Sequence, residues 1–169
     1  MDREGFWRII EQNRGDADAV QRGLATLPAA EIAAWHRMYY DLHNALHRGD
    51  VWDVADILYN NLVESPSSDD NFHYFKAWLI GKGREAYETA LRQPDDLGRF
   101  ILPADLEASC DNESLNYAAE KAWESLGNDR EQLERNSNED EEPAGERCDP
   151  EDWSQRFPKL VKRFGPCRW

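Results

Sequence analysis

The sequence has few of the features that mark a specialised class of protein. Cysteine is the first example, because the chain has only three. Cys110, Cys148 and Cys167 are odd in number, far apart and without a Cys-x-x-Cys pair. This argues against a disulfide framework and against a zinc site, so we expect reduced thiols. No apolar run approaches the roughly 20 residues of a membrane span. The acidic start, Met1 to Glu4, lacks a signal-peptide pattern. These absences predict a cytoplasmic protein without a membrane partner.

Catalytic and cofactor motifs are also missing. The chain has no Gly-x-Ser-x-Gly elbow, no His-Glu-x-x-His pair and no glycine-rich phosphate loop. No cofactor is therefore predicted, and no residue is assigned as catalytic. The sequence also lacks the period-two alternation of a β-strand and the repeats of a solenoid. The predicted fold is all-α.

Basic residues are in short supply. The chain of 169 residues carries 34 acidic and 20 basic side chains, a formal charge of -14. Such a charge argues against nucleic acid as a partner, because a phosphate backbone would be repelled. It leaves open, as a weaker hypothesis, an acidic mimic of nucleic acid that covers a basic protein surface. The length suits one domain, and seven Trp, six Tyr and six Phe supply bulky core residues.

The most informative stretch runs from Ser68 to Arg84 and predicts a buried helix with polar ends and an apolar stripe. Phe72, Phe75, Trp78 and Leu79 recur at helical spacing. Ser68, Asp69 or Asp70 can cap its start, and we favour one of the two acids. Gly81 and Gly83 can end it, with the next helix opening at Arg84.

The spacing of apolar residues and the helix-ending residues predict the other elements. Pro28 suits the first turn of the third helix, which should be the longest, and Asp50 should cap the fourth after Gly49. Short turns of helix and loop are expected over 94–110. The remaining helices are predicted over residues 2–14, 16–27, 29–48, 50–62, 84–93, 111–127 and 153–164.

These elements predict a compact single domain, a multi-helix bundle or an orthogonal helical array. Residues 1–135 form the helical domain in this prediction. Residues 136–152 are acidic and hold little that is large and apolar, so we expect a mobile, disordered loop. Helical spacing resumes at Trp153, so residues 153–169 should dock back on the domain as a closing helix.

Three groups of residues also carry a resemblance. They are Asp69-Asp70-x-Phe72-x-Tyr74-Phe75-x-x-Trp78-Leu79-Ile80-x-x-Gly83-Arg84, Phe6-Trp7-x-x-Ile10 near the start, and Phe157-Pro158-x-Leu160 near the end. Together they resemble the bacterial domain-of-unknown-function family numbered 4240. The resemblance implies no activity, cofactor or catalytic residue.

Three histidines lie on one face of the predicted third helix. His43 and His47, four residues apart, can in principle chelate one ion, whereas His36 is too far along the axis. A third ligand would have to come from Asp50, Asp53 or another helix. Ordinary surface or half-buried histidines are the simpler interpretation, so no metal is predicted and His43 and His47 are weak candidates only.

Aromatic residues outside the apolar stripes have two interpretations: short helices bury more than one face each, or some of these rings are exposed in a patch that contacts a partner. We predict a non-enzymatic binding or adaptor domain that recognises a protein or peptide through a groove beside the 70–84 helix. The alternative is an enzyme of unrecognised class that uses Asp69, Asp70, His73 and Arg84. Asp69 and Arg84 can meet only if the chain folds back at Gly83. The oligomeric state stays open, and the predicted binding residues are Asp69, Asp70, His73, Tyr74, Arg84 and Trp52.

Overall fold

The computed structural model describes residues 1–63, 67–133, 136–138 and 141–164. Its elements are α1 (Arg3–Gln12), α2 (Ala17–Leu24), α3 (Ala29–Ala45), α4 (Gly49–Val63), α5 (Asp69–Gly81), α6 (Arg84–Arg92), η1 (Pro94–Phe100), α7 (Pro103–Glu107), η2 (Glu113–Tyr117), α8 (Ala118–Ser125), η3 (Arg130–Gln132), η4 (Pro150–Asp152), α9 (Trp153–Arg156) and α10 (Pro158–Phe164). Within those ranges the only β pairing is one isolated bridge. The all-α prediction is confirmed. Parts of the predicted acidic loop and of the C-terminal segment 153–169, including Cys167, lie outside the described residues.

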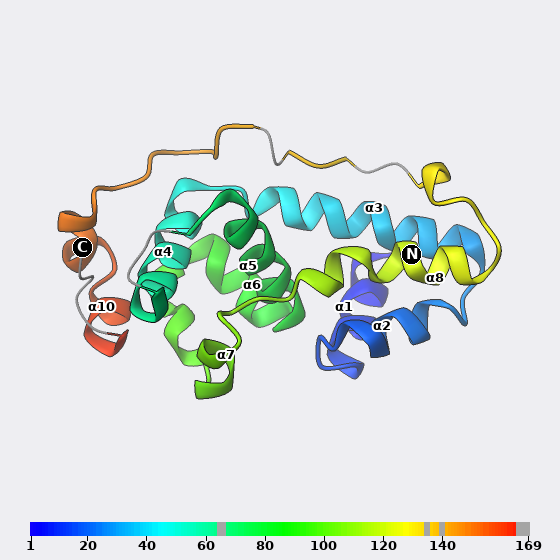
Figure 1. Cartoon of the computed structure of the whole chain (residues 1–169), viewed down its shortest axis with the longest axis horizontal. Helices are drawn as coiled ribbons and strands as arrows, with labels where there is room; N and C mark the ends of the chain where they lie inside the picture. The colour runs from blue at the N-terminus through cyan, green and yellow to red at the C-terminus, as the bar shows by residue number, and fades with distance from the viewer. Residues whose placement is uncertain (64–66, 134–135, 139–140, 165–169) are drawn as a thin grey trace.

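Helix α3 is the longest described helix and runs roughly along the long axis of the molecule, on the right of the view in Figure 1. One end of it packs with α1 and α8, and its other half contacts α5. Helix α10 contacts α4 and η1 at the opposite end of the molecule from α2. Across the described ranges, no helix combines the length and the apolar character that a membrane crossing requires.

The centre of the core beside α1 is a stack of aromatic rings. The Trp35 ring lies between those of Phe6 and Tyr39, at centroid distances of 4.9 and 5.4 Å. All three side chains are buried. The Tyr39 hydroxyl donates to Asn116 Oδ1 at 2.6 Å, which gives this buried phenol a polar partner.

Two glycines allow the turn after α1 to reach the end of α5. Gly15 has a φ of +68°, and a Cβ added there would collide with the backbone carbonyl of Gly81. Only glycine tolerates both the conformation and this approach. The Asn112 side chain donates to the Gly15 carbonyl at 3.0 Å, so η2 is held at the same junction.

Several predicted helix boundaries need correction. Ser68, not Asp69 or Asp70, caps α5: its hydroxyl accepts from the Asn71 amide at 3.2 Å, and the Asn71 side chain accepts from the Ser68 amide at 3.1 Å. Helix α3 ends at Ala45 rather than Arg48. Helix α4 begins at Gly49, and the Asp50 carboxylate pairs with the Arg48 guanidinium instead of capping.

The predicted closing helix is in fact two helices. The chain leaves the helical conformation at Phe157 (φ -127°, ψ 55°), because the residue before a proline is disfavoured in a helix, and Pro158 opens α10. Trp153, Phe157 and Leu160 are buried. The Asp95 carboxylate accepts the Lys159 and Leu160 amides at 3.0 Å, capping α10 from η1.

The described part of the acidic segment runs along one edge of the molecule toward α9 (Figure 1). At the turn between α3 and α4 its Ala144 amide donates to the His47 carbonyl at 2.9 Å, and the Gly49 amide donates to the Ala144 carbonyl at 3.0 Å. A Cβ at Gly49 would lie 2.8 Å from the Glu146 backbone. These contacts end α3 early. The division into a domain, a mobile loop and a docked end stays a prediction.

Candidate functional site

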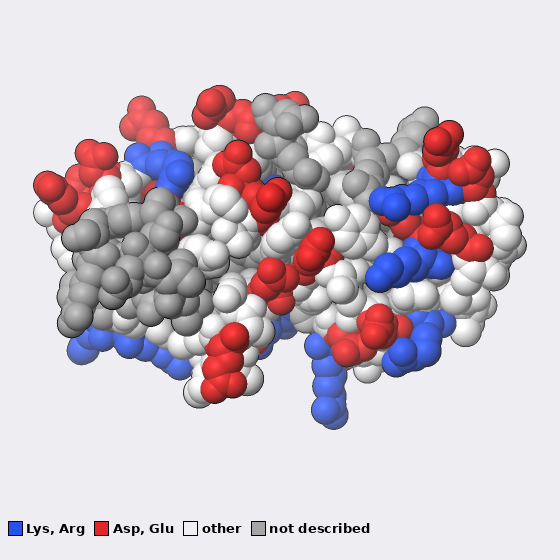
Figure 2. Space-filling view, in the orientation of Figure 1, with Lys and Arg blue, Asp and Glu red and all other residues white. Residues whose placement is uncertain are grey.

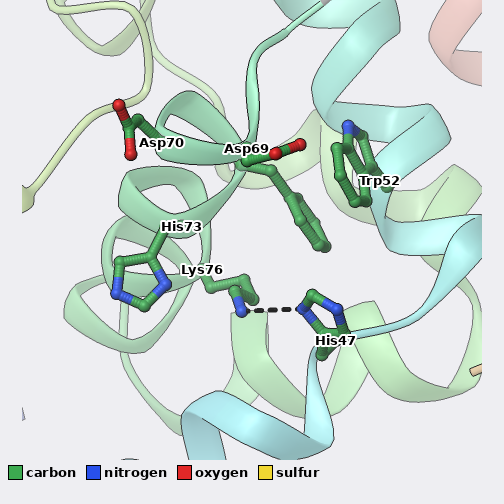
Figure 3. Close-up of a pocket in the computed structure, with 7 residues that line it drawn as sticks. His47, Trp52, Asp69, Asp70, His73 and Lys76 are labelled. Atoms are coloured by element: carbon green, nitrogen blue, oxygen red, sulfur yellow. Dashed lines mark hydrogen bonds between the residues drawn. The ribbon is translucent and has the colours of Figure 1, made fainter. Parts of the chain in front are cut away.

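A cavity of about 200 Å³ opens between the α3–α4 turn and the first two turns of α5 (Figure 3). It brings together four of the six predicted binding residues and adds three others. The predicted residues are Trp52, Asp69, Asp70 and His73, and the additional ones are His47, Phe72 and Lys76. We call this the α5 cavity.

An aromatic pair forms one wall of the α5 cavity. The rings of Trp52 and Phe72 stack at a centroid distance of 4.5 Å and an angle of 15°. Phe72 is buried and Trp52 half-buried. The Trp52 indole N–H donates to Ser67 Oγ at 3.1 Å, which fixes the orientation of the ring. The wall therefore offers a rigid apolar surface beside the opening.

A buried lysine paired with a histidine lines the inner part of the cavity. The Lys76 side chain is 1% exposed, and its Nζ lies 3.1 Å from His47 Nδ1 and 5.1 Å from the centre of the Phe72 ring. His47 Nε2 lies 2.8 Å from the Glu141 carbonyl oxygen. Because a carbonyl can only accept, Nε2 carries the proton and Nδ1 accepts from Lys76. His47 is thus held as the neutral tautomer.

The surroundings of the two predicted metal candidates favour their neutral forms. Burial, and then the Lys76 charge, lower the pKa of His47, although its bond to Glu141 opposes this. Burial and the same lysine lower the pKa of His43 well below its usual range. His43 Nε2 donates to the His73 carbonyl at 3.1 Å. Among the described residues, no three His, Cys, Asp or Glu side chains are grouped to hold a metal ion.

The two aspartates form the rim. Asp69 and Asp70 are exposed in the first turn of α5. The Asp69 carboxylate points toward Trp52, and Asp70 lies on the other side, above His73 (Figure 3). With both histidines of the α3 end neutral and Lys76 buried, the negative charge of the rim is what an approaching group meets first.

Two predicted binding residues lie elsewhere. Arg84 begins α6, where it pairs with Glu4 at 2.5 Å and Glu88 at 2.9 Å. The chain does turn at Gly83, but toward α1 and not back along α5. Tyr74 is on another face of α5, where burial and then the Glu113 carboxylate raise the pKa of its phenol.

Sequence reasoning missed Lys76, and one signal could have identified it. The lysine interrupts the run Phe75–Ile80, in which every other residue is apolar. A charged residue inside a buried helix needs a partner.

The Cys110 thiol is not a nucleophile at neutral pH, because burial raises its pKa to about 12.

Neither a curated protein nor a solved structure matches this chain. A family model does match, over residues 1–125, and its description is "Protein of unknown function (DUF4240)". The matched residues contain α1 to α8 and every residue that lines the α5 cavity, whereas the acidic segment and α9–α10 lie beyond them. The match confirms the resemblance seen in the sequence, and the chain belongs to the DUF4240 family.

Proposed function

We propose that this protein is a non-enzymatic binding domain that recognises a protein or peptide through the α5 cavity. The observation that carries the proposal is the combination of a stacked aromatic wall, an acidic rim and a small volume. Sites for small molecules commonly measure about 300–1,000 Å³. The α5 cavity, at about 200 Å³, is better matched to one side chain of a larger partner.

The rim favours a basic side chain as the occupant. A Lys or Arg side chain that enters beside Asp69 can place its charge near that carboxylate and its methylene groups along the Trp52 ring, and Asp70 adds negative charge on the other side of the rim. The formal charge of -14 would also speed the approach of a basic partner. Figure 2 shows acidic side chains spread over much of the visible surface. The Lys76 ammonium competes only weakly with an entering cation for the rim carboxylates, because Lys76 is buried and bonded to His47.

The test is selection from a library of random peptides displayed on phage, with the full-length chain immobilised. Selected peptides should be enriched in Lys and Arg, and their affinity should fall about tenfold or more in an Asp69→Asn/Asp70→Asn double variant, because two rim charges are removed. Asp18→Asn is the matched control, since Asp18 occupies the same second position of α2 that Asp70 occupies in α5. Equal loss in both variants, or peptides without basic residues, would contradict the proposal.

An enzyme remains the second candidate because polar groups converge beside the cavity. Of the residues named for the alternative enzyme, Asp69, Asp70 and His73 line the cavity and Arg84 does not, and the Lys76–His47 pair lies beside them. Incubation with a cell metabolite extract, followed by NMR, would reveal turnover. Turnover that Lys76→Met abolishes would favour this candidate over the binding domain. The nucleic-acid mimic rests on the overall charge alone and stays a prediction.

A further inference from the structure

The far side of Trp52 from Phe72 carries a second feature that the α5 cavity does not use. Arg147, in the acidic segment, lies with its guanidinium carbon 4.7 Å from the centre of the Trp52 ring. Its Nε donates to Asp53 at 3.4 Å, and its Nη2 donates to Asp56. Asp53 and Asp56 are 0% and 2% exposed, whereas the Arg147 side chain is 40% exposed. A surface guanidinium thus reaches two buried carboxylates.

One of the two carboxylates, Asp56, is held by a residue outside the acidic segment, whereas Asp53 is held from within that segment. The Asp56 Oδ1 accepts from the amide and the hydroxyl of Ser67, which also accepts from the Trp52 indole. The other oxygen of Asp56 is the one that faces Arg147. Asp53 Oδ2 accepts the Cys148 amide at 3.0 Å and leaves Oδ1 to Arg147. We call Trp52, Asp53 and Asp56 the α4 slot.

The geometry suits a guanidinium better than an ammonium. A guanidinium is planar, so it can lie on an indole face while separate N–H groups reach two acceptors, and an ammonium cannot do both. The backbone adds direction, since Ala144 pairs with His47 and Gly49 three residues before the arginine. The segment therefore pairs with the α3–α4 turn, bends at Gly145 and then lies against α4 with one anchoring side chain.

We propose that the α4 slot is an arginine-binding site for a peptide segment of a partner protein, and that Arg147 occupies it within this chain. The residues of the slot lie within the family match, and Arg147 lies beyond it. The acidic segment and the partner's arginine compete for the same carboxylates. Because Arg147 belongs to the same chain as the slot, its effective concentration there is high. The arginine of a partner therefore binds when the acidic segment is displaced. This inference needs a protein or peptide partner, as the proposed function does, but it uses the Asp53 and Asp56 carboxylates and shares only Trp52 with the α5 cavity.

The test uses the full-length Arg147→Ala chain and two synthetic peptides. One spans residues 142–149 with Cys148→Ser, and the other is identical except for Arg147→Lys. The arginine peptide should raise the melting temperature of Arg147→Ala in a saturable way and bind about tenfold or more tightly than the lysine peptide, because only arginine forms the two-acceptor contact. It should leave the unsubstituted chain almost unchanged at the same concentration. Equal responses to both peptides, or equal responses of both chains, would overturn the proposal.

Two further measurements keep the proposal testable and separate it from the α5 cavity. Adding Asp69→Asn/Asp70→Asn to Arg147→Ala should leave the arginine peptide's affinity unchanged, and its loss would place the peptide in the cavity instead. If Arg147→Ala does not fold, amide exchange in the unsubstituted chain replaces it. Excess arginine peptide should then quicken exchange at Ala144 and Cys148, whose amides hold the segment. Unchanged exchange at both amides would overturn the proposal.

Discussion

The two ends of α3 lie in different chemical surroundings. Near its start Trp35 packs between aromatic rings of α1 and α3, in a region held together by apolar contacts. Beyond its end His47 lies among a buried lysine, a backbone carbonyl and the acidic segment. Buried charges contribute little net stability, because their desolvation offsets their attraction, whereas aromatic burial contributes several kcal/mol. We infer that the first region maintains the fold and that the second is kept for binding.

The largest expected effect contrasts one tryptophan from each region. Trp35→Ala should lower the free energy of unfolding by about 3–5 kcal/mol, because it empties a fully buried site. Trp52→Ala should cost about 1–3 kcal/mol, since that ring is half-buried. Urea unfolding followed by circular dichroism measures both. Equal losses would show that the two regions contribute alike and would remove the basis of the comparison.

The first region could be predicted from sequence and much of the second could not. Apolar spacing and helix-ending residues predicted helices that correspond to α1, α2 and α3, with the third as the longest. These signals are local. The acidic segment is bound through backbone hydrogen bonds and one arginine, to residues about ninety positions earlier in the chain. Neither the backbone hydrogen bonds nor the arginine contact produces a periodic pattern of residues in the sequence.

Part of the candidate site was nevertheless predictable. Asp69, Asp70, His73 and Trp52 were selected because charged and aromatic residues stood outside the apolar stripes, and they do share one cavity. Arg84 was selected for the same reason, but the path of the chain after Gly83 takes it to α1. Sequence therefore indicated which residues were exposed and polar, and only the fold determined which of them meet.

The second prediction concerns the buried carboxylates of the α4 slot. Arg147→Ala should lower the free energy of unfolding by about 1–3 kcal/mol at pH 7, less than for a fully buried pair because Arg147 is 40% exposed. Burial raises the pKa of Asp53, and Arg147 partly offsets this. Without Arg147 the carboxyl takes up a proton at higher pH, and the neutral form needs no cation.

The difference in the free energy of unfolding between the unsubstituted chain and Arg147→Ala should therefore shrink as the pH falls from 7 toward about 4. Urea unfolding at several pH values measures this. Arg92→Ala is the control, because Arg92 pairs with the Glu88 carboxylate on the surface of α6. A difference that stays constant with pH would mean that Arg147 acts through packing rather than charge.

The third prediction tests the neutral histidines at the end of α3. Because burial holds the pKa of His43 below its usual value, the unfolded chain binds a proton there before the folded chain does. Stability should fall as the pH drops below about 6.5, by up to about 1.4 kcal/mol per pH unit for this group. His43→Gln keeps a donor for the His73 carbonyl and should flatten the decline between pH 6.5 and 5. An unchanged slope would assign the acid sensitivity to other groups.

The smallest effects distinguish folding from binding at the start of α5. Ser68→Ala removes the cap hydroxyl and should cost about 1 kcal/mol, whereas Asp70→Asn weakens only an exposed charge near the helix dipole and should cost less than about 0.5 kcal/mol. The binding effects should run in the opposite order. Peptides selected on the α5 cavity should lose affinity with Asp70→Asn and keep most of it with Ser68→Ala, because the hydroxyl faces the helix amide and not the opening. Melting temperature and peptide affinity, measured on both variants, decide the matter: if Asp70→Asn destabilises the chain and leaves the affinity intact, the rim serves the helix and not a partner.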